Sequence, residues 1–309
     1  MVNIIHISPH QALNRIHTPS MGFEWSINPY RGCSHACHYC YARDTHRYLN
    51  FGIGEDFSRK LIVKEHFSET LRNNLRNVSI HDIVTLGTAT DPYQPIEAKY
   101  RITRSILEVL AHSGHAVSIT TKSPLILRDL DLLTPMAKRG QVEVHISLIS
   151  LDRNQLRILE PGTGSPNRRV KTMAKLLASG IPTGWFLAPI LPFITDQDSV
   201  LEPIFSLART MKVRWLMAGA AHFTPSVYHY FYQTISSTSL SPNLHQFTSV
   251  YQGSNRTLKN PYRQHLRRRL ECLYQRYGIM STTQGPRGYE PFQQSEFLFT
   301  YPNTSAANK

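Results

Sequence analysis

The chain has 309 residues, of which 41% are hydrophobic and 18% are charged, a balance that excludes a disordered protein. The longest apolar run covers residues 185–194 and is interrupted by Pro189 and Pro192, which excludes a membrane span. Lys and Arg number 34 against 21 Asp and Glu, and the net charge of +13 favours a polyanionic partner such as DNA or RNA. No export signal is evident and the few cysteines are clustered, so we expect a cytoplasmic protein.

The first predicted element of interest, a short strand over residues 24–28, leads into a loop that holds three of the chain's four cysteines. Cys33, Cys37 and Cys40 lie in a stretch of eight residues, and a disulfide framework would leave one of them unpaired. Closely spaced thiols usually bind a metal centre, because several thiolates must converge on one soft ion or cluster. Three ligands are fewer than the four that complete a structural zinc site or an iron–sulfur cluster. The loop therefore predicts a metal centre with an open coordination position.

Buried strands and amphipathic helices alternate in the next part of the chain. Continuous apolar or β-branched runs predict strands at residues 83–87, 116–121, 142–148, 183–189 and 213–217. Helical patterns lie between them, at residues 99–113, 125–139, 166–179 and 199–212. Gly114, Gly140 and Gly180 stand where three of these helices would end. The alternation predicts an α/β fold with a parallel sheet and right-handed crossovers, either open or curled into a barrel.

Polar residues follow several of these strands. Because ligands of such folds gather at the carboxyl ends of the strands, we expect the cysteine loop and these side chains to lie at one rim. The residues are Thr88, Thr90, Asp91, Lys122, Ser123, Ser147 and Ser150.

The pattern changes after residue 220. Residues 225–233 are rich in aromatic side chains, and residues 261–277 predict a basic helix. We therefore divide the chain into residues 1–220, a barrel-like unit with the cysteine loop at 33–40, and residues 221–309, a C-terminal helical extension and tail.

Five blocks of this sequence, in the same order, resemble the radical S-adenosylmethionine (SAM) superfamily, in its branch related to spore photoproduct lyase and often labelled DNA repair photolyase-like. The first block contains the Cys-x3-Cys-x2-Cys spacing with Tyr39 before the last cysteine. The blocks are residues 28–43, 87–97, 121–123, 159–169 and 188–192. The resemblance covers roughly residues 20–220.

This resemblance implies a partial (β/α)6 barrel of the TIM type and a [4Fe–4S] cluster bound by Cys33, Cys37 and Cys40. SAM would chelate the fourth iron, and its one-electron cleavage would give a 5′-deoxyadenosyl radical that abstracts hydrogen from a substrate. The resemblance also implies an electron donor such as flavodoxin or ferredoxin. We expect a monomeric, lyase-like enzyme whose substrate is DNA or RNA.

The resemblance also implies roles for six residues in SAM binding. Tyr39 would pack beside the adenine, and the turn that contains Gly87 and Thr90 would face the methionine amino group. Lys122 and Ser147 match positions that reach the SAM carboxylate and ribose. Pro189 would lie under the adenine.

One position departs from the pattern of the lyase. Spore photoproduct lyase has a hydrogen-donor cysteine in the turn after the second strand, and this chain has Thr88 there. A threonine hydroxyl has a strong O–H bond and cannot replace a thiol in returning a hydrogen atom. The remaining cysteine, Cys272, lies in the basic C-terminal helix and is expected to be an exposed, inert thiol. We therefore expect a reaction other than spore photoproduct repair by the known route.

Several alternatives remain open on the sequence alone. The cysteine loop could bind zinc, with His35, His38 or His46 as the fourth ligand, in a non-catalytic nucleic-acid-binding protein. A radical SAM enzyme of this size could also modify a peptide or protein. The arginines of residues 263–276 could contact phosphate or form a solvated helix face, and the aromatic side chains of residues 228–232 could stack on bases or pack in a core. Glu160 and Arg169 could pair to shape the SAM pocket or to fix a loop.

Overall fold

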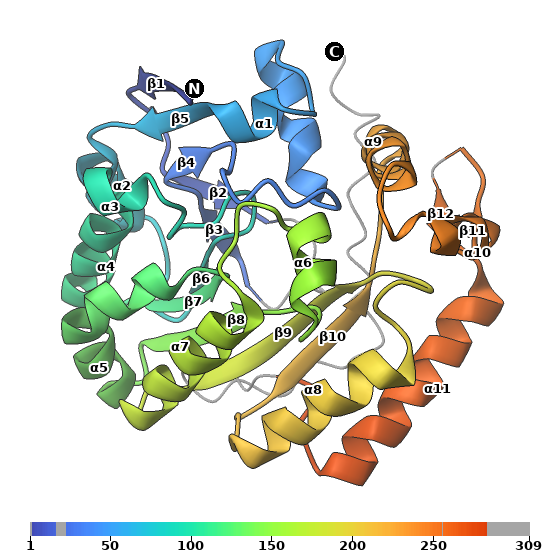
Figure 1. The fold of residues 1–309 in the computed structure, drawn as a ribbon. Coiled ribbons are helices and arrows are strands. Elements are labelled where there is room, and N and C mark those ends of the chain that lie inside the picture. Colours follow the sequence, from blue (N-terminus) through green and yellow to red (C-terminus); the bar gives the residue numbers. More distant parts are fainter. Residues whose placement is uncertain (1, 17–22, 255, 283–309) are drawn as a thin grey trace.

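The computed structural model describes residues 2–16, 23–254 and 256–282, with a seven-stranded sheet at its centre (Figure 1). Six of these strands are parallel, and each pairs with the next one in chain order. They are β3 (Trp25–Ile27), β6 (Ile83–Leu86), β7 (Ala116–Thr121), β8 (Val142–Ser147), β9 (Thr183–Ile190) and β10 (Leu216–Ala220). This is the predicted partial (β/α)6 arrangement, with antiparallel β2 (Leu13–Arg15) at one edge.

Helices cover the outer side of this sheet (Figure 1). Strands such as β6 and β8 are buried along their whole length, which explains why their sequences are continuous apolar and β-branched runs. Gly114 ends one of the covering helices with a φ of +77°, a left-handed conformation that glycine adopts without steric cost. The predicted helices are α4 (Ile102–Ser113), α5 (Leu130–Lys138), α7 (Pro166–Ala178) and α8 (Asp198–Thr210), and shorter elements are α3 (Glu97–Tyr100), η3 (Pro124–Asp129) and α6 (Arg153–Leu159).

The last parallel strand begins three residues later than predicted, at Leu216 instead of residue 213. The amide of Val213 donates to the carbonyl of Ala208 and so closes the end of α8. Val213 and Trp215 are nevertheless buried, so their side chains carry the same apolar signal as a strand. The hydrophobic pattern therefore located the element but not its first residue.

A small N-terminal sheet was not predicted. In it, β1 (Asn3–Ile7) runs parallel to β5 (Lys60–Lys64), and β4 (Tyr30–Arg31) pairs with β5 on the other side. β1 is largely exposed and β4 has two residues, so neither gives a hydrophobic period long enough to recognise. The neighbouring helices are η2 (Tyr41–Leu49), α1 (Asp56–Arg59) and α2 (Phe67–Leu75).

The C-terminal extension is mostly helical, as expected, and adds one short hairpin. It contains α9 (Pro225–Ser236), η4 (Ser241–Asn243), α10 (Leu244–Ser249), β11 (Tyr251–Gln252), β12 (Thr257–Leu258) and α11 (Asn260–Tyr277). Tyr228 and Phe231 of α9 are buried against a set of aromatic rings, so these two side chains pack in a core. Residues 283–309 of the predicted tail lie outside the described residues.

Three arginines of α11 face carboxylates of the chain itself. Arg267 pairs with Glu271 on the same helix at 2.9 Å, Arg269 with Asp198 and Arg276 with Glu202, both at 2.5 Å on α8. Much of the basic charge of this helix is therefore balanced at its own surface. None of the helices in the described residues is long and apolar enough to cross a membrane.

Candidate metal centre and cofactor site

The cysteine loop connects the start of the sheet to η2 and carries three thiols without disulfide bonds. Cys33 and Cys37 are each 7% exposed, and Cys40 is half-buried. Gly32 opens the loop with a φ of +79°, and a Cβ there would lie 2.9 Å from the carbonyl oxygens of Lys60 and Phe57. The chain thus enters the loop through a turn that only glycine fits without strain.

The segment that follows β6 holds one side of this loop. The hydroxyl of Thr90 donates to the carbonyl of Gly32 at 2.7 Å, and the amide group of Gln94 donates to the same carbonyl at 3.1 Å. Gln94 also accepts from the backbone N–H of Ser34 at 3.0 Å. One buried glutamine therefore forms hydrogen bonds with the backbone on both sides of Cys33.

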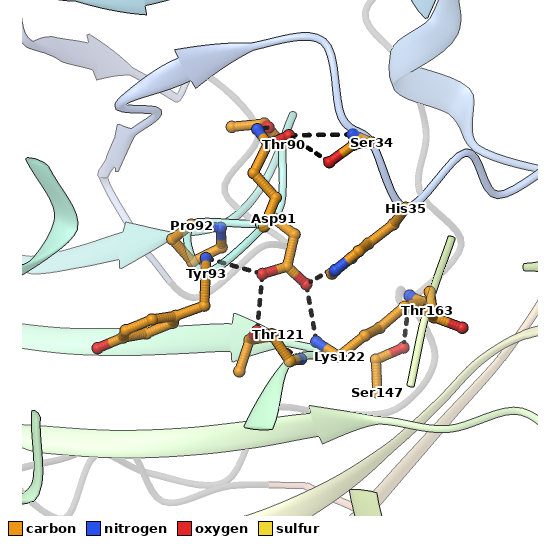
Figure 2. A network of polar contacts seen from close by, with 12 residues as sticks. Ser34, His35, Thr90, Asp91, Pro92, Tyr93, Thr121, Lys122, Ser147 and Thr163 are labelled. Atoms are coloured by element: carbon orange, nitrogen blue, oxygen red, sulfur yellow. Dashed lines mark hydrogen bonds and ion pairs between the residues drawn. The ribbon is translucent and has the colours of Figure 1, made fainter. Parts of the chain in front are cut away.

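His35 and Asp91 form a buried pair beside Cys33, shown in Figure 2, with Nδ1 and Oδ2 3.2 Å apart. Asp91 also accepts from Thr121 Oγ1 and from the Lys122 backbone N–H, both at 2.7 Å. Burial raises the pKa of Asp91, but His35 and these donors outweigh it and lower the pKa to about 2. Burial lowers the pKa of His35, but Asp91 and Cys33 outweigh it and raise the pKa to about 10. The carboxylate thus fixes an imidazolium between itself and the thiol.

The segment between α6 and α7 holds the opposite side of the loop. The backbone N–H of Gly162 donates to the carbonyl of His35 at 3.0 Å, and that of His38 donates to the carbonyl of Leu159 at 2.9 Å. A Cβ on Gly162 would overlap the carbonyl oxygen of Ser34. Glycine is therefore required here for close approach of two backbones.

Glu160 and Arg169 form an ion pair, and both are almost inaccessible to solvent. Glu160 also accepts from the hydroxyl of Tyr39 in the cysteine loop. Arg169 donates to the backbone carbonyl of Ser147 at 3.0 Å. The pair therefore links the cysteine loop to the end of β8, so it shapes the rim as well as fixing a loop.

Lys122 and Ser147 meet at the ends of β7 and β8, with Nζ 2.9 Å from Oγ (Figure 2). The Lys122 ammonium also lies 5.9 Å from the centre of the Tyr39 ring. Burial lowers the pKa of Lys122, but Glu160 and Cys37 outweigh it and raise the pKa. A lasting positive charge therefore stands between the cysteine loop and the sheet, where it can attract a carboxylate.

The pKa values of the three thiols indicate that their ionised forms need a positive charge nearby. Burial raises the pKa of Cys37 and Cys40, and the charge of the Cys33 thiolate adds to the rise at both. Burial also opposes ionisation of Cys33, but His35 outweighs it and lowers the pKa. Thiolates that oppose one another's ionisation in this way need a positive charge near them, which a bound metal supplies. The donor set thus fits an iron–sulfur cluster.

Of the three histidines considered as a fourth zinc ligand, His38 and His46 contact groups other than the thiols, whereas His35 lies between Asp91 and Cys33. His35 faces Asp91, Nδ1 of His38 lies 3.0 Å from the hydroxyl of Tyr230, and Nε2 of His46 lies 3.0 Å from the carbonyl of Lys60. Within residues 2–16, 23–254 and 256–282, no three His, Cys, Asp or Glu side chains converge on a site for a single ion.

The other predicted SAM-binding residues lie at the same rim. Gly87 directly follows β6 with a φ of +103°, and a Cβ there would overlap the carbonyl oxygen of Thr120. Thr90 is 5% exposed, and its hydroxyl is already engaged by Gly32 and Gln94, so its visible role is to support the cysteine loop. Pro189 lies near the carboxyl end of β9, after a cis peptide bond. A direct role of these residues in SAM binding stays a prediction.

Several residues that build the site were not predicted from the sequence. Gln94, Gly162 and Arg43 lie within the blocks that resemble the family but were given no role, because each acts on the backbone of another segment. Asp91 was predicted to lie at the rim, where it accepts from the backbone of Tyr93, but its pairing with His35 was not predicted. The order of polar residues after successive strands was the signal that could have indicated this pairing.

The comparison with protein families agrees with this geometry. The model of the radical SAM superfamily matches residues 27–201. The chain belongs to the radical SAM superfamily. An uncharacterized protein of Mycobacterium tuberculosis is 40% identical over 195 residues, which are 62% of this chain and 57% of that protein. The alignment thus spans little more than half of this curated relative.

Solved structures share the fold at low sequence identity. Spore photoproduct lyase with bound AdoMet and dinucleoside spore photoproduct has a TM-score of 0.64 at 16% identity, covering 89% of this chain and 79% of the lyase. SuiB of Streptococcus suis, bound to the precursor peptide SuiA, has a TM-score of 0.52 at 12% identity, covering 82% of this chain and 46% of SuiB. These likenesses confirm the predicted α/β fold, with its partial barrel of parallel strands.

Proposed function

We propose that this radical SAM protein cleaves SAM reductively and uses the resulting radical to abstract hydrogen from a nucleic acid. The observation that carries this proposal is the set of three free thiols, two buried and one half-buried, on one loop next to the Lys122–Ser147 pair. When bound, the [4Fe–4S] cluster supplies the electron that cleaves SAM to methionine and a 5′-deoxyadenosyl radical. Cys33, Cys37 and Cys40 would hold the cluster, which leaves one iron for the cosubstrate.

The rim offers matching groups for SAM. The Lys122 ammonium and the Ser147 hydroxyl would receive the SAM carboxylate and ribose, since both are polar groups at the ends of adjacent strands. Tyr39 would pack beside the adenine, with its hydroxyl held by Glu160. Gly87 would let the backbone approach the methionine end, and Pro189 would lie under the adenine. The chain's part is to position SAM and to exclude water from the radical.

A nucleic acid is the substrate class that the chain supports best. The net charge of +13 attracts polyanions, although three arginines of α11 are already paired with carboxylates. Spore photoproduct lyase, which shares the fold, binds a dinucleoside lesion. An electron donor such as flavodoxin or ferredoxin would supply the electron, and we propose that the protein acts as a monomer.

The structure gives a reason for a reaction unlike the known lyase route. By the resemblance to the lyase, Thr88 matches the position of its hydrogen-donor cysteine, and the side-chain amide of Asn28 donates to the Thr88 hydroxyl at 3.0 Å. Tyr41 binds the carbonyl of the same residue. Thr88 is thus part of a fixed polar contact and does not offer a weak X–H bond. Cys272 is exposed on α11, as expected.

The proposal is tested by anaerobic reconstitution with iron and sulfide, followed by incubation with SAM and dithionite. We expect about four irons per chain and release of 5′-deoxyadenosine that increases when DNA or RNA is added. The Cys37→Ala variant should lose both the cluster and SAM cleavage, whereas Cys272→Ala should keep both. Stoichiometric zinc in place of iron, or SAM cleavage by the Cys37→Ala variant, would contradict the assignment.

The substrate class has its own outcome. If 5′-deoxyadenosine forms but its rate never responds to single-stranded or double-stranded nucleic acid, the preference for nucleic acid is wrong. Stimulation by a peptide library instead would favour the peptide-modifying alternative, because SuiB shares the fold and binds a precursor peptide.

A further inference from the structure

Helix α9 lies outside the residues that match the family model and yet contacts the cysteine loop. The hydroxyl of Tyr230 is 3.0 Å from Nδ1 of His38, which stands between Cys37 and Tyr39. One turn earlier, Ser226 donates to the carboxylate of Asp44 at 2.6 Å. The C-terminal extension therefore contacts the cysteine loop at His38 and the helix that follows it, η2, at Asp44.

Arg43 gives this contact its importance. Its guanidinium is 1% exposed and donates to the carbonyls of Ala36 and Cys37, both at 2.8 Å. It also donates to the carbonyls of Ile53 and Gly54 at 2.8 and 2.9 Å. One charged group thus gathers four backbone carbonyls, two of them on the cysteine loop.

The Arg43 guanidinium is enclosed by two aromatic rings. Its central carbon lies 4.4 Å from the centre of the Tyr230 ring and 5.1 Å from that of the Phe57 ring. A buried guanidinium is stable only where carbonyls and ring faces replace its water. Tyr230 supplies one of these ring faces, so the hydrogen bonds of Arg43 to the cysteine loop depend on α9.

We propose that Tyr230 is a positioning residue of the metal centre, which holds the cysteine loop through His38 with its hydroxyl and through Arg43 with its ring. This inference rests on the proposed cluster-binding role of the three cysteines. It means that the cluster-binding unit of this chain extends beyond residue 201, where the family match ends, as far as α9.

Two substitutions separate the two contacts. Tyr230→Phe removes the hydroxyl and keeps the ring, whereas Tyr230→Leu removes both. Tyr232→Phe is the matched control, because Tyr232 lies on the same helix and is 40% exposed. All three variants are made in the full chain, and thermal unfolding checks that each one folds.

The first measurement uses the protein without metal, so it does not depend on the proposed function. Hydrogen exchange of the amides of residues 36–43 should be about three- to tenfold faster in Tyr230→Phe and faster still in Tyr230→Leu. The control should exchange like the wild type. Unchanged exchange in both Tyr230 variants would overturn the inference.

The second measurement follows iron release from reconstituted protein into an excess of chelator. Both Tyr230 variants should release iron faster than the wild type and the Tyr232→Phe control, by about three- to tenfold for the loss of the hydroxyl. If the wild type binds no cluster, the proposed function fails. If the wild type binds a cluster and the Tyr230 variants release it at the wild-type rate, only the present inference fails.

Discussion

The rim of the barrel and helix α11 both carry ion pairs, but they use them differently. At the rim, Glu160 and Arg169 are almost fully buried and tie a metal-binding loop to a strand. On α11, Arg267 and Glu271 pair at the surface, with 61% and 45% of their side chains exposed. Exposed pairs contribute little, whereas a buried charge that loses its partner is costly. Burial and partners, more than the number of charges, mark the functional part of this protein.

The largest expected effect comes from breaking the buried pair. Glu160→Gln leaves the Arg169 guanidinium buried without a carboxylate, so the free energy of unfolding should fall by about 3–5 kcal/mol. Urea denaturation of the metal-free protein measures this change. Glu271→Gln is the surface control and should change stability by less than about 1 kcal/mol. Equal losses of stability in the two variants would show that the buried and the exposed ion pair contribute alike.

A smaller effect is expected where two backbones meet. Gly162→Ala would force a Cβ against the carbonyl oxygen of Ser34, so the loop must move and stability should fall by about 1–3 kcal/mol. Iron content after reconstitution should fall with it. Gly164→Ala is the control two residues away, since a Cβ there would meet its nearest neighbours at 3.9 Å. A variant at Gly162 that binds iron like the wild type would show that close approach is not needed.

The pH dependence of stability offers a test outside the rim. Burial, and then the charge of Arg31, lowers the pKa of Lys64 to about 8. The unfolded chain binds more protons than the folded one between about pH 8 and 10.5, so stability should rise with pH in this range. Compared with Lys64→Met, the wild type should gain about 1–2 kcal/mol, allowing for partial exposure. Parallel urea titrations at pH 7.5 and 10 measure it, and parallel pH profiles of the two proteins would contradict it.

The smallest effect is expected on α11. Arg267→Gln should change the affinity for DNA or RNA less than about twofold, because Glu271 already balances the charge at 2.9 Å. Fluorescence anisotropy with a labelled oligonucleotide at two salt concentrations measures this. If the substitution instead lowered the slope of log affinity against log salt concentration by about one, Arg267 would contact a phosphate.

The sequence was informative wherever a local pattern had one structural outcome. Local sequence patterns predicted the six parallel strands, five of them from apolar or β-branched runs, whereas the metal site indicated by three cysteines in one loop stays a prediction. The pattern could not predict contacts between distant segments, such as Gln94 with Ser34 or Tyr230 with His38. The start of β10 was predicted too early for a related reason, since Trp215 precedes the strand but is as buried as a strand residue.

The contact between Tyr230 and His38 also bears on when the centre can be completed in the cell. The two residues are separated by 192 positions, although the three thiols themselves are neighbours in the chain. During synthesis the three thiols therefore leave the ribosome long before Tyr230, the residue that we propose positions them. On the proposed roles of the thiols and Tyr230, we expect stable loading with iron to follow synthesis of α9, and a shortened product that ends before α9 to lose its metal faster than the full chain.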